Sequence, residues 1–298
     1  MVEDGTTPED LGRPGHIFPL RYVEGGVLKR TGQTEASIDI CRISGLKEAA
    51  IICEIMANDG QMARMPALEY FANNHDLKII SVADLITYRR RHERLIERVA
   101  EARVPTEYGE FHAVSYNSIV DDYEHVAFVK GDINPKDPVL VRVHSECLTG
   151  DVFGSTRCDC GDQIPLALEA IGKEGKGILL YMRQEGRGIG IHNKLKAYAL
   201  QDEGYDTVDA NTMLGFAPDP RQYGIGAQIL EDLGVKKMRL LTNNPTKRVG
   251  LERFGLEVVD RVPIVAPYRD ENVDYMETKR TRMGHIFEPM DPTSGETS

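Results

Sequence analysis

Three of the chain's five cysteines lie close together in the stretch CLTGDVFGSTRCDCGDQ, residues 147–163. Cys147, Cys158 and Cys160 have the spacing C-x10-C-x-C. Thiolates bind zinc strongly, and three of them leave one tetrahedral position open for water, as in a catalytic site. With His144 as a fourth ligand, the same cysteines would form a closed structural site, and the spacing alone favours neither alternative. A thioredoxin-like redox pair is disfavoured because it requires C-x-x-C.

A glycine-rich stretch, RQEGRGIG at 183–190, follows a predicted buried strand and precedes a predicted helix. Glycines there let backbone N–H groups approach phosphate oxygens, and the helix N-terminus adds a favourable field. Such a stretch alone is often only a tight turn. Arg183 and Arg187 strengthen the phosphate interpretation, because guanidinium groups bind phosphates bidentately. Glu185 would accept hydrogen bonds from a base or ribose, or hold a metal.

Two other stretches are ambiguous when each is considered alone. LLTNNPTKRVG (240–250) places Lys247 in the first turn of a predicted helix, where an ordinary N-cap with solvated cations is the simpler interpretation. GFAPDPRQYG (215–224) holds Asp219 and Arg221 and is typical of a surface turn. Together with the cysteines and the glycine-rich stretch, they predict a zinc-bound water beside a polyphosphate site, which is the layout of a hydrolase.

The chain of 298 residues is 41% hydrophobic, a composition typical of a globular protein with two domains. Its net charge of −11 argues against a general nucleic-acid binder, which needs a basic face, but not against binding of an anionic small molecule. The apolar runs fall short of the roughly 18–20 residues of a membrane span. The start MVEDGTTPED lacks the features of a secretory signal, so a cytoplasmic location is expected, or a plastid stroma after removal of a transit peptide.

Hydrophobic patterning predicts an α/β (α+β) protein, with a mixed sheet and flanking helices in its second part and a partial α/β unit before it. In the second part, strands are predicted at 111–120, 125–131, 138–146, 176–182, 237–242 and 256–263. Helices are predicted there at 162–175, 192–204, 226–234 and 245–255. The polar tail 288–298 is expected to be disordered.

In the first part, helices are predicted at 36–46 and 65–77, and strands at 47–56 and 78–85. A long charged helix is predicted at 85–104, so that residues 94–105 form a helical linker that ends at Pro105. Cys41 and Cys53 lie on apolar stretches and are predicted to be buried core residues.

Four motifs in order resemble GTP cyclohydrolase II of riboflavin biosynthesis: VRVHSECLTGDVFGSTRCDCGDQ, YMRQEGRGIGIHNKLKAY, DPRQYGIGAQIL and LLTNNPTK. The resemblance extends over a domain at 106–287. That family hydrolyses GTP to a 2,5-diamino-6-ribosylamino-pyrimidinone 5'-phosphate, formate and pyrophosphate. The resemblance implies one catalytic zinc per chain, Mg²⁺ with the GTP triphosphate, and a homodimer. The net charge and the short apolar runs predict neither a nucleic acid nor a membrane as partner.

The resemblance also implies the roles of individual residues. It makes Cys147, Cys158 and Cys160 the zinc ligands, which resolves the ambiguity of the cysteine spacing in favour of catalysis. It assigns catalysis to Asp219 as proton acceptor, to Arg221 as nucleophile on the α-phosphorus, and to Tyr198 near the purine. The residues that it places around GTP are Arg142, Val143, His144, Ser145, Glu146, Gln163, Glu185, Gly186, Arg187, Thr207, Thr242 and Lys247.

The front of the chain resembles the C-terminal half of 3,4-dihydroxy-2-butanone 4-phosphate synthase, through RPGHIFPL, GGVLKRTGQTEAS and CEIMANDGQMAR. The two enzymes are often fused in that order. The synthase motif G-H-T-E-A uses its histidine to bind magnesium, but Gln33 stands at that position here. A neutral amide is a poor replacement for imidazole, so residues 1–93 are expected to be a catalytically silent remnant. An alternative for the whole chain is a GTP-binding regulatory module with structural zinc and no turnover.

Overall fold

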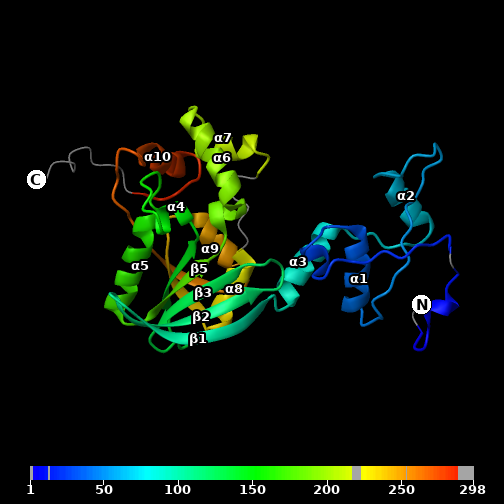
Figure 1. The fold of residues 1–298 in the computed structure, drawn as a ribbon, viewed down its shortest axis with the longest axis horizontal. Coiled ribbons are helices and arrows are strands. Elements are labelled where there is room, and N and C mark those ends of the chain that lie inside the picture. The colour runs from blue at the N-terminus through cyan, green and yellow to red at the C-terminus, as the bar shows by residue number, and fades with distance from the viewer. Residues whose placement is uncertain (1–2, 13, 217–222, 253, 288–298) are drawn as a thin grey trace, which may run out of the picture. The chain divides into compact units, whose positions relative to one another are not determined.

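The computed structural model describes residues 3–12, 14–216, 223–252 and 254–287 (Figure 1). The chain divides into two compact units, Met1–Arg94 and Leu95–Ser298. The first unit contains the 3-10 turns η1 (Pro8–Asp10) and η2 (Gly26–Leu28) and the helices α1 (Gln33–Ile43), α2 (Ala67–Asn74) and α3 (Val82–His92).

A buried ion pair holds part of the first unit together. The Asp39 carboxylate on α1 accepts hydrogen bonds from the Val27 N–H of η2 at 2.8 Å and from Arg89 Nη1 of α3 at 2.9 Å. Arg89 also donates to the carbonyl oxygen of Gly25 at 2.7 Å. Because both charges are paired and shielded from water, this contact fixes η2, α1 and α3 against one another.

Two strands predicted in the first unit do not form. Residues 47–55 and 78–81 have no strand partner among the described residues, and only an isolated bridge joins Met56 to Met62. Ile51 is 88% exposed, so the apolar run that suggested a buried strand is not buried in this unit. The prediction that Cys53 is a core residue is also wrong because Cys53 is exposed, and Cys41 is only half-buried.

The second unit is built on a seven-stranded sheet with the order β1-β2-β3-β5-β4-β6-β7. Its strands are β1 (Ile96–Thr106), β2 (Gly109–Ser118), β3 (Glu124–Lys130), β4 (Val139–Ser145), β5 (Gly177–Met182), β6 (Lys237–Leu241) and β7 (Glu257–Val262). Strand β1 pairs with β2, β2 with β3, and β3 with β5, all antiparallel. Strands β5, β4, β6 and β7 pair in that order and are parallel to one another. The expected mixed sheet with flanking helices is confirmed.

Helices cover both faces of the parallel half of the sheet. On one face, α5 (Cys160–Glu174) packs Ala167 and Ile171 against Leu140 and Leu179. On the other face, α8 (Tyr223–Asp232) brings Gly226 within van der Waals reach of Leu180. Residues 139–144 of β4 are therefore buried on both sides, as is typical of a central parallel strand.

The predicted helix at 85–104 is wrong in its second half, and residues 94–105 are not a helical linker. Helix α3 ends at His92, and Ile96–Thr106 forms the edge strand β1, with Pro105 paired to Glu110 of β2. Strand β1 is mostly exposed, and its charged side chains include Arg103, which forms an ion pair with Glu110 at 2.8 Å. Charged residues are common on edge strands, and a strand rich in them has a composition similar to that of a solvent-exposed helix. This similarity explains the wrong prediction.

The other helices of the second unit are α4 (Leu148–Asp151), α6 (Gly190–Asp202), α7 (Thr207–Met213), α9 (Pro245–Glu252) and α10 (Val273–Thr281), with a 3-10 turn η3 (Glu185–Gly188). In Figure 1, α6, α7 and α10 lie toward the same end of the sheet. The segments that follow β4, β5 and β6 begin at their carboxyl ends, where α/β sheets place their ligands. Each described helix is too short or too polar to span a membrane.

Candidate active site

The three clustered cysteines form a compact sulfur group at the carboxyl end of β4. The sulfur atoms of Cys147, Cys158 and Cys160 all lie within 4.8 Å of one another, and Cys147 Sγ lies 3.6 Å from Cys158 Sγ. Cys147 lies between β4 and α4, at the N-terminal cap of α4, and Cys160 is the first residue of α5. Backbone comes close to the group at Gly150, where a Cβ would lie 3.1 Å from Cys147 Sγ and 3.2 Å from Cys158 Sγ. The glycine leaves room for the sulfurs, and such a donor set fits zinc.

His144 does not join this group. Its Nε2 lies 3.1 Å from each carboxylate oxygen of Asp151, and its ring stacks on Tyr181 with the centroids 5.6 Å apart. Burial lowers the pKa of His144, so the ring is neutral and Nε2 donates to the carboxylate. Among the described residues, no histidine or carboxylate adds a fourth ligand atom to the three sulfurs. This arrangement favours a site with an open position over a closed structural site.

Asp151 connects the end of β4 to the first cysteine. Besides His144, its carboxylate accepts hydrogen bonds from the Cys147 N–H and the Tyr181 hydroxyl, both at 2.9 Å. A buried carboxylate with three donors holds each of them in a fixed place. Asp151 therefore sets the position of Cys147. It was not among the residues predicted from the sequence, although it lies only four residues after that cysteine.

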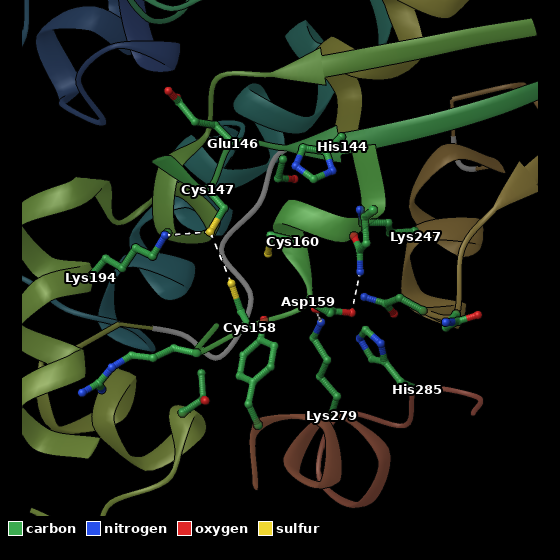
Figure 2. A pocket seen from close by; sticks show the side chains of 18 of the residues that line it. His144, Glu146, Cys147, Cys158, Asp159, Cys160, Lys194, Lys247, Lys279 and His285 are labelled. Atoms are coloured by element: carbon green, nitrogen blue, oxygen red, sulfur yellow. Dashed lines mark hydrogen bonds and ion pairs between the residues drawn. The ribbon is translucent and has the colours of Figure 1, made fainter. Parts of the chain in front are cut away.

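Lys194 of α6 contacts the sulfur group directly. Its Nζ lies 3.0 Å from Cys147 Sγ and 2.7 Å from Glu185 Oε1, and Figure 2 shows Cys147 Sγ between Lys194 and Cys158. Hydrogen bonds from Cys158 and Cys160, and then the charge of Lys194, hold the pKa of Cys147 well below its ordinary value. The hydrogen bond with Cys147 raises the pKa of Cys158 to about 11. The ammonium of Lys194 beside Cys147 therefore favours the thiolate form of that cysteine, which is the form that binds a metal.

The Glu185 carboxylate is bound by protein groups. It accepts hydrogen bonds from the Leu148 N–H at 2.6 Å and the Gly186 N–H at 2.9 Å, in addition to Lys194. It thereby ties the glycine-rich turn η3 to the cysteine segment. The sequence suggested that Glu185 binds a base, a ribose or a metal. To do so, its carboxylate would have to exchange these contacts for new ones.

A pocket opens beside the sulfur group, and most of the residues that the sequence predicted for the site line it. They are Arg142, His144, Ser145, Glu146, Cys147, Cys158, Cys160, Gln163, Gly186, Tyr198, Thr207, Thr242 and Lys247. Val143 is not part of the lining, but its carbonyl oxygen accepts a hydrogen bond from Lys247 Nζ at 2.9 Å. Glu185 is not part of the lining either. The side chain of Arg187 and the whole of Asp219 and Arg221 lie outside the described residues.

The pocket is basic although the chain is acidic. Among the described residues, its lining contains five cationic side chains and two carboxylates, those of Glu146 and Asp159; the cations are Arg142, Arg157, Lys194, Lys247 and Lys279. The Arg142 guanidinium donates to the Leu241 carbonyl oxygen at 2.8 Å and to Gln163 Oε1. A concentration of cations in a concave site attracts a polyanion even when the net charge of the protein is negative.

Several residues of this pocket were not found from the sequence. Lys194 is four residues before Tyr198 on α6, and this spacing places both side chains on one helix face, which could have indicated it. No such local pattern exists for Lys279, because its partner Asp159 is 120 residues earlier in the chain. Contacts between residues this far apart in the sequence arise only from the tertiary fold.

Comparison with known proteins matches the two parts of the chain to two enzyme families. The sequence model of GTP cyclohydrolase II matches residues 97–263, and that of 3,4-dihydroxy-2-butanone 4-phosphate synthase matches residues 1–88. The synthase-like part is thus an N-terminal part of this chain, which corrects its description as a C-terminal fragment.

Among relatives, a probable bifunctional riboflavin biosynthesis protein RIBA 2, chloroplastic, from Oryza sativa subsp. japonica is 59% identical over 96% of this chain. This chain covers 52% of the rice protein, about half its length. The riboflavin biosynthesis protein RibBA of Mycobacteroides abscessus is 57% identical, over 98% of this chain and 72% of its own.

A solved structure also matches. It is that of RibBX, a two domain 3,4-dihydroxy-2-butanone 4-phosphate synthase from A. baumannii, with 36% identity and a TM-score of 0.55 over 89% of this chain and 68% of that chain. The cyclohydrolase match extends from residue 97 to residue 263, which is more than half of the 298 residues, and it contains all three clustered cysteines. The chain therefore belongs to the GTP cyclohydrolase II family.

Proposed function

We propose that this protein is a zinc-dependent GTP cyclohydrolase II, which hydrolyses GTP to 2,5-diamino-6-(5-phospho-ribosylamino)pyrimidin-4(3H)-one, formate and pyrophosphate in the first step of riboflavin biosynthesis. The observation that carries the proposal is the sulfur group: three cysteine sulfurs within 4.8 Å, with no fourth ligand atom among the described residues, on the wall of a basic pocket. An open metal position beside a polyanion site suits hydrolysis of a nucleoside triphosphate.

Cys147, Cys158 and Cys160 would hold the zinc, which when bound lowers the pKa of a water and polarises the bond that is attacked. Around it, Lys247 and Arg142 provide positive charge toward the triphosphate, and Mg²⁺ would neutralise more of its charge. Because the Arg142 guanidinium is already bonded to Leu241 and Gln163, we expect it to act through its charge and by holding Gln163 in place.

Tyr198 is proposed to act near the purine as a proton donor. Its hydroxyl lies 3.2 Å from Thr149 Oγ1, and the Arg157 guanidinium lies 5.1 Å from the centre of its ring. Burial raises the pKa of Tyr198, so the phenol keeps its proton at neutral pH. A protonated hydroxyl on the pocket wall can donate to a ring nitrogen or to a carbonyl oxygen.

Two proposed catalytic residues, Asp219 and Arg221, lie outside the described residues, and their roles rest on the family resemblance. Arg221 would attack the α-phosphorus, forming a P–N bond while the bond to the leaving pyrophosphate breaks. A guanidinium is not nucleophilic while protonated, since its pKa exceeds about 12, so Asp219 would accept its proton. Water would later cleave the P–N bond and release the 5'-phosphate.

We further propose that residues 1–93 lack synthase activity. Gln33 occupies the place of the magnesium-binding histidine of the synthase motif, and its Nε2 donates to Glu54 Oε1 at 3.1 Å instead. The test of this proposal is to supply ribulose 5-phosphate and Mg²⁺ and to assay for formate, which we expect to be absent.

We also propose that the protein is a homodimer. Its proposed location is the cytoplasm or a plastid stroma; the rice relative is named chloroplastic.

The main test is to incubate the purified, zinc-loaded chain with GTP and Mg²⁺ and to measure formate and pyrophosphate together. We expect both in equal amounts, and loss of most formate release in Cys158→Ser. Cys41→Ser, a cysteine of the first unit, is the matched control and should behave like the parent. If GTP stays intact and bound, the alternative of a regulatory module with structural zinc replaces this proposal.

A further inference from the structure

The segment after the matched cyclohydrolase region contributes to the pocket. The family match ends at residue 263, yet Tyr275, Lys279, His285 and Phe287 line the pocket. In Figure 2, Lys279 and His285 point toward the cysteines from the side of α10. We call residues 268–287 the C-terminal strap.

Three sets of contacts anchor the strap to the elements that carry the site. The Arg269 guanidinium binds Asp162 of α5 through two hydrogen bonds of 2.5 and 2.8 Å. Arg282 bonds Asp206 and Asp209 at the start of α7, and the Ile286 N–H donates to the Asn243 carbonyl oxygen at 2.8 Å. The strap thus connects α5, α7 and the segment after β6.

Lys279 is the buried contact at the centre of the strap. Its Nζ lies 2.5 Å from Asp159 Oδ1 and 4.4 Å from the centre of the Tyr275 ring, and its side chain is only 7% exposed. Asp159 is 1% exposed and is the single residue between Cys158 and Cys160. Its other oxygen accepts a hydrogen bond from Gln163 Nε2 at 2.6 Å.

A buried carboxylate is tolerated only when it is paired and hydrogen-bonded, and its partners then determine where it lies. Because Asp159 stands between two sulfur donors, fixing its carboxylate also fixes the turn that presents both sulfurs. Replacing a group that orients metal ligands in this way typically weakens metal affinity about 10–100-fold.

From this geometry we infer that Lys279 is a positioning residue of the metal centre. Through Asp159 it fixes the turn that presents the sulfurs of Cys158 and Cys160, so the strap is part of the metal site as well as of the pocket wall. The inference rests on the proposed function only in taking the metal to be zinc.

The experiment is to measure the zinc affinity of the full chain by competition with a chelator, for the parent and for Lys279→Met. We expect the variant to bind zinc about 10–100-fold more weakly, with a changed sulfur-to-cobalt charge-transfer band after Co²⁺ substitution. Arg280→Met is the matched control: Arg280 is on the same helix and bonds Glu277 of α10, so its zinc affinity should equal that of the parent. Parent-like affinity in Lys279→Met would overturn the inference.

A second variant separates positioning from folding. Lys279→Met leaves the Asp159 charge buried and unpaired, whereas the double variant Lys279→Met/Asp159→Asn removes both charges and should restore thermal stability. We expect zinc affinity to remain weak in the double variant, because the ionic contact that orients the turn is still missing. If zinc affinity returned together with stability, the pair would be only structural and the inference would be wrong. Since no GTP is used, a chain that binds zinc normally but releases no formate contradicts the proposed function alone.

Discussion

The Nζ of Lys194 lies 3.0 Å from Cys147 Sγ, so an ammonium group donates directly to one of the three sulfurs. Glu185, at 2.7 Å from the same nitrogen, keeps the ammonium in this place. A hydrogen bond from a cation reduces the electron donation of a thiolate, and it also compensates part of the charge of three thiolates around a dication. Lys194 is therefore expected to influence both metal affinity and reactivity.

Replacing Lys194 by methionine tests this contact. The Lys194→Met variant should lose about 10–100-fold in zinc affinity or in formate release, which is the usual effect of removing a group that bonds a metal ligand. The measurements are chelator competition and steady-state kinetics with GTP. Lys196→Met is the matched control, because Lys196 is exposed on the same helix and should tolerate the change. Equal losses in both variants would contradict a specific role for Lys194.

Replacing Gly150 by alanine tests the space beside the sulfurs. A Cβ at this position would lie 3.1 Å from Cys147 Sγ and 3.2 Å from Cys158 Sγ, which is too close without a shift of the sulfurs or the backbone. Gly150→Ala should therefore purify with a clearly reduced zinc content, measured by elemental analysis. Gly12→Ala, where a Cβ meets nothing within 4 Å, should keep the zinc content of the parent. A fully loaded Gly150→Ala protein would show that the site tolerates the methyl group.

Asp151 is expected to contribute strongly to stability. Asp151→Asn removes the charge that His144, Tyr181 and the Cys147 N–H share, and an amide cannot accept from all three donors. The free energy of unfolding should fall by about 1.5–3 kcal/mol, as for hydrogen bonds to charged groups. Urea unfolding measures this change. Asp137→Asn, at an exposed ion pair with Lys176, should change the stability by less than about 1 kcal/mol.

The stability of the protein should decrease in mild acid because of His125. Burial lowers the pKa of His125 below its ordinary value, and Nδ1 accepts the Arg183 N–H at 3.1 Å. As the pH falls from 7 toward 5, the unfolded chain binds a proton on this side chain before the folded chain does, so the free energy of unfolding decreases. His125→Asn keeps an acceptor for the N–H without this titration.

The melting temperature of His125→Asn should therefore change less between pH 7 and pH 5 than that of the parent. His112→Asn, at an exposed position, should retain the parent's pH dependence. A variant of His125 with an unchanged pH profile would assign the acid sensitivity to other groups.

The sequence was informative where chemistry is local. The cysteine cluster, the glycine-rich stretch and Lys247 each lie in a short motif, and the structure brings them to one pocket. The strands of the sheet from β2 to β7 could also be predicted, because their apolar residues are buried by the fold. Strand β1 could not, since an exposed edge strand has no buried face to give it a period of two.

Other features depend on contacts that no local pattern encodes. Lys279 reaches Asp159 over 120 positions, and α10 is weakly amphipathic in sequence, so nothing marks the strap as part of the site. In the first unit, residues 47–55 have the composition of a buried strand but no partner strand among the described residues. A segment with the composition of a strand forms one only where a neighbouring strand pairs with it.

All three sulfurs come from a single stretch of fourteen residues, Cys147 to Cys160, whereas the pocket walls are drawn from segments as far apart as Arg142 and Phe287. Closing a short loop costs little conformational entropy compared with assembling the whole unit. A nascent chain can therefore bring the three sulfurs together early, whereas the Lys279–Asp159 contact that orients two of them forms only after α10 has been synthesised. On the ribosome, we expect ion capture to begin as a weak local event, and both full metal affinity and recognition of the nucleotide to wait until α10 is in place.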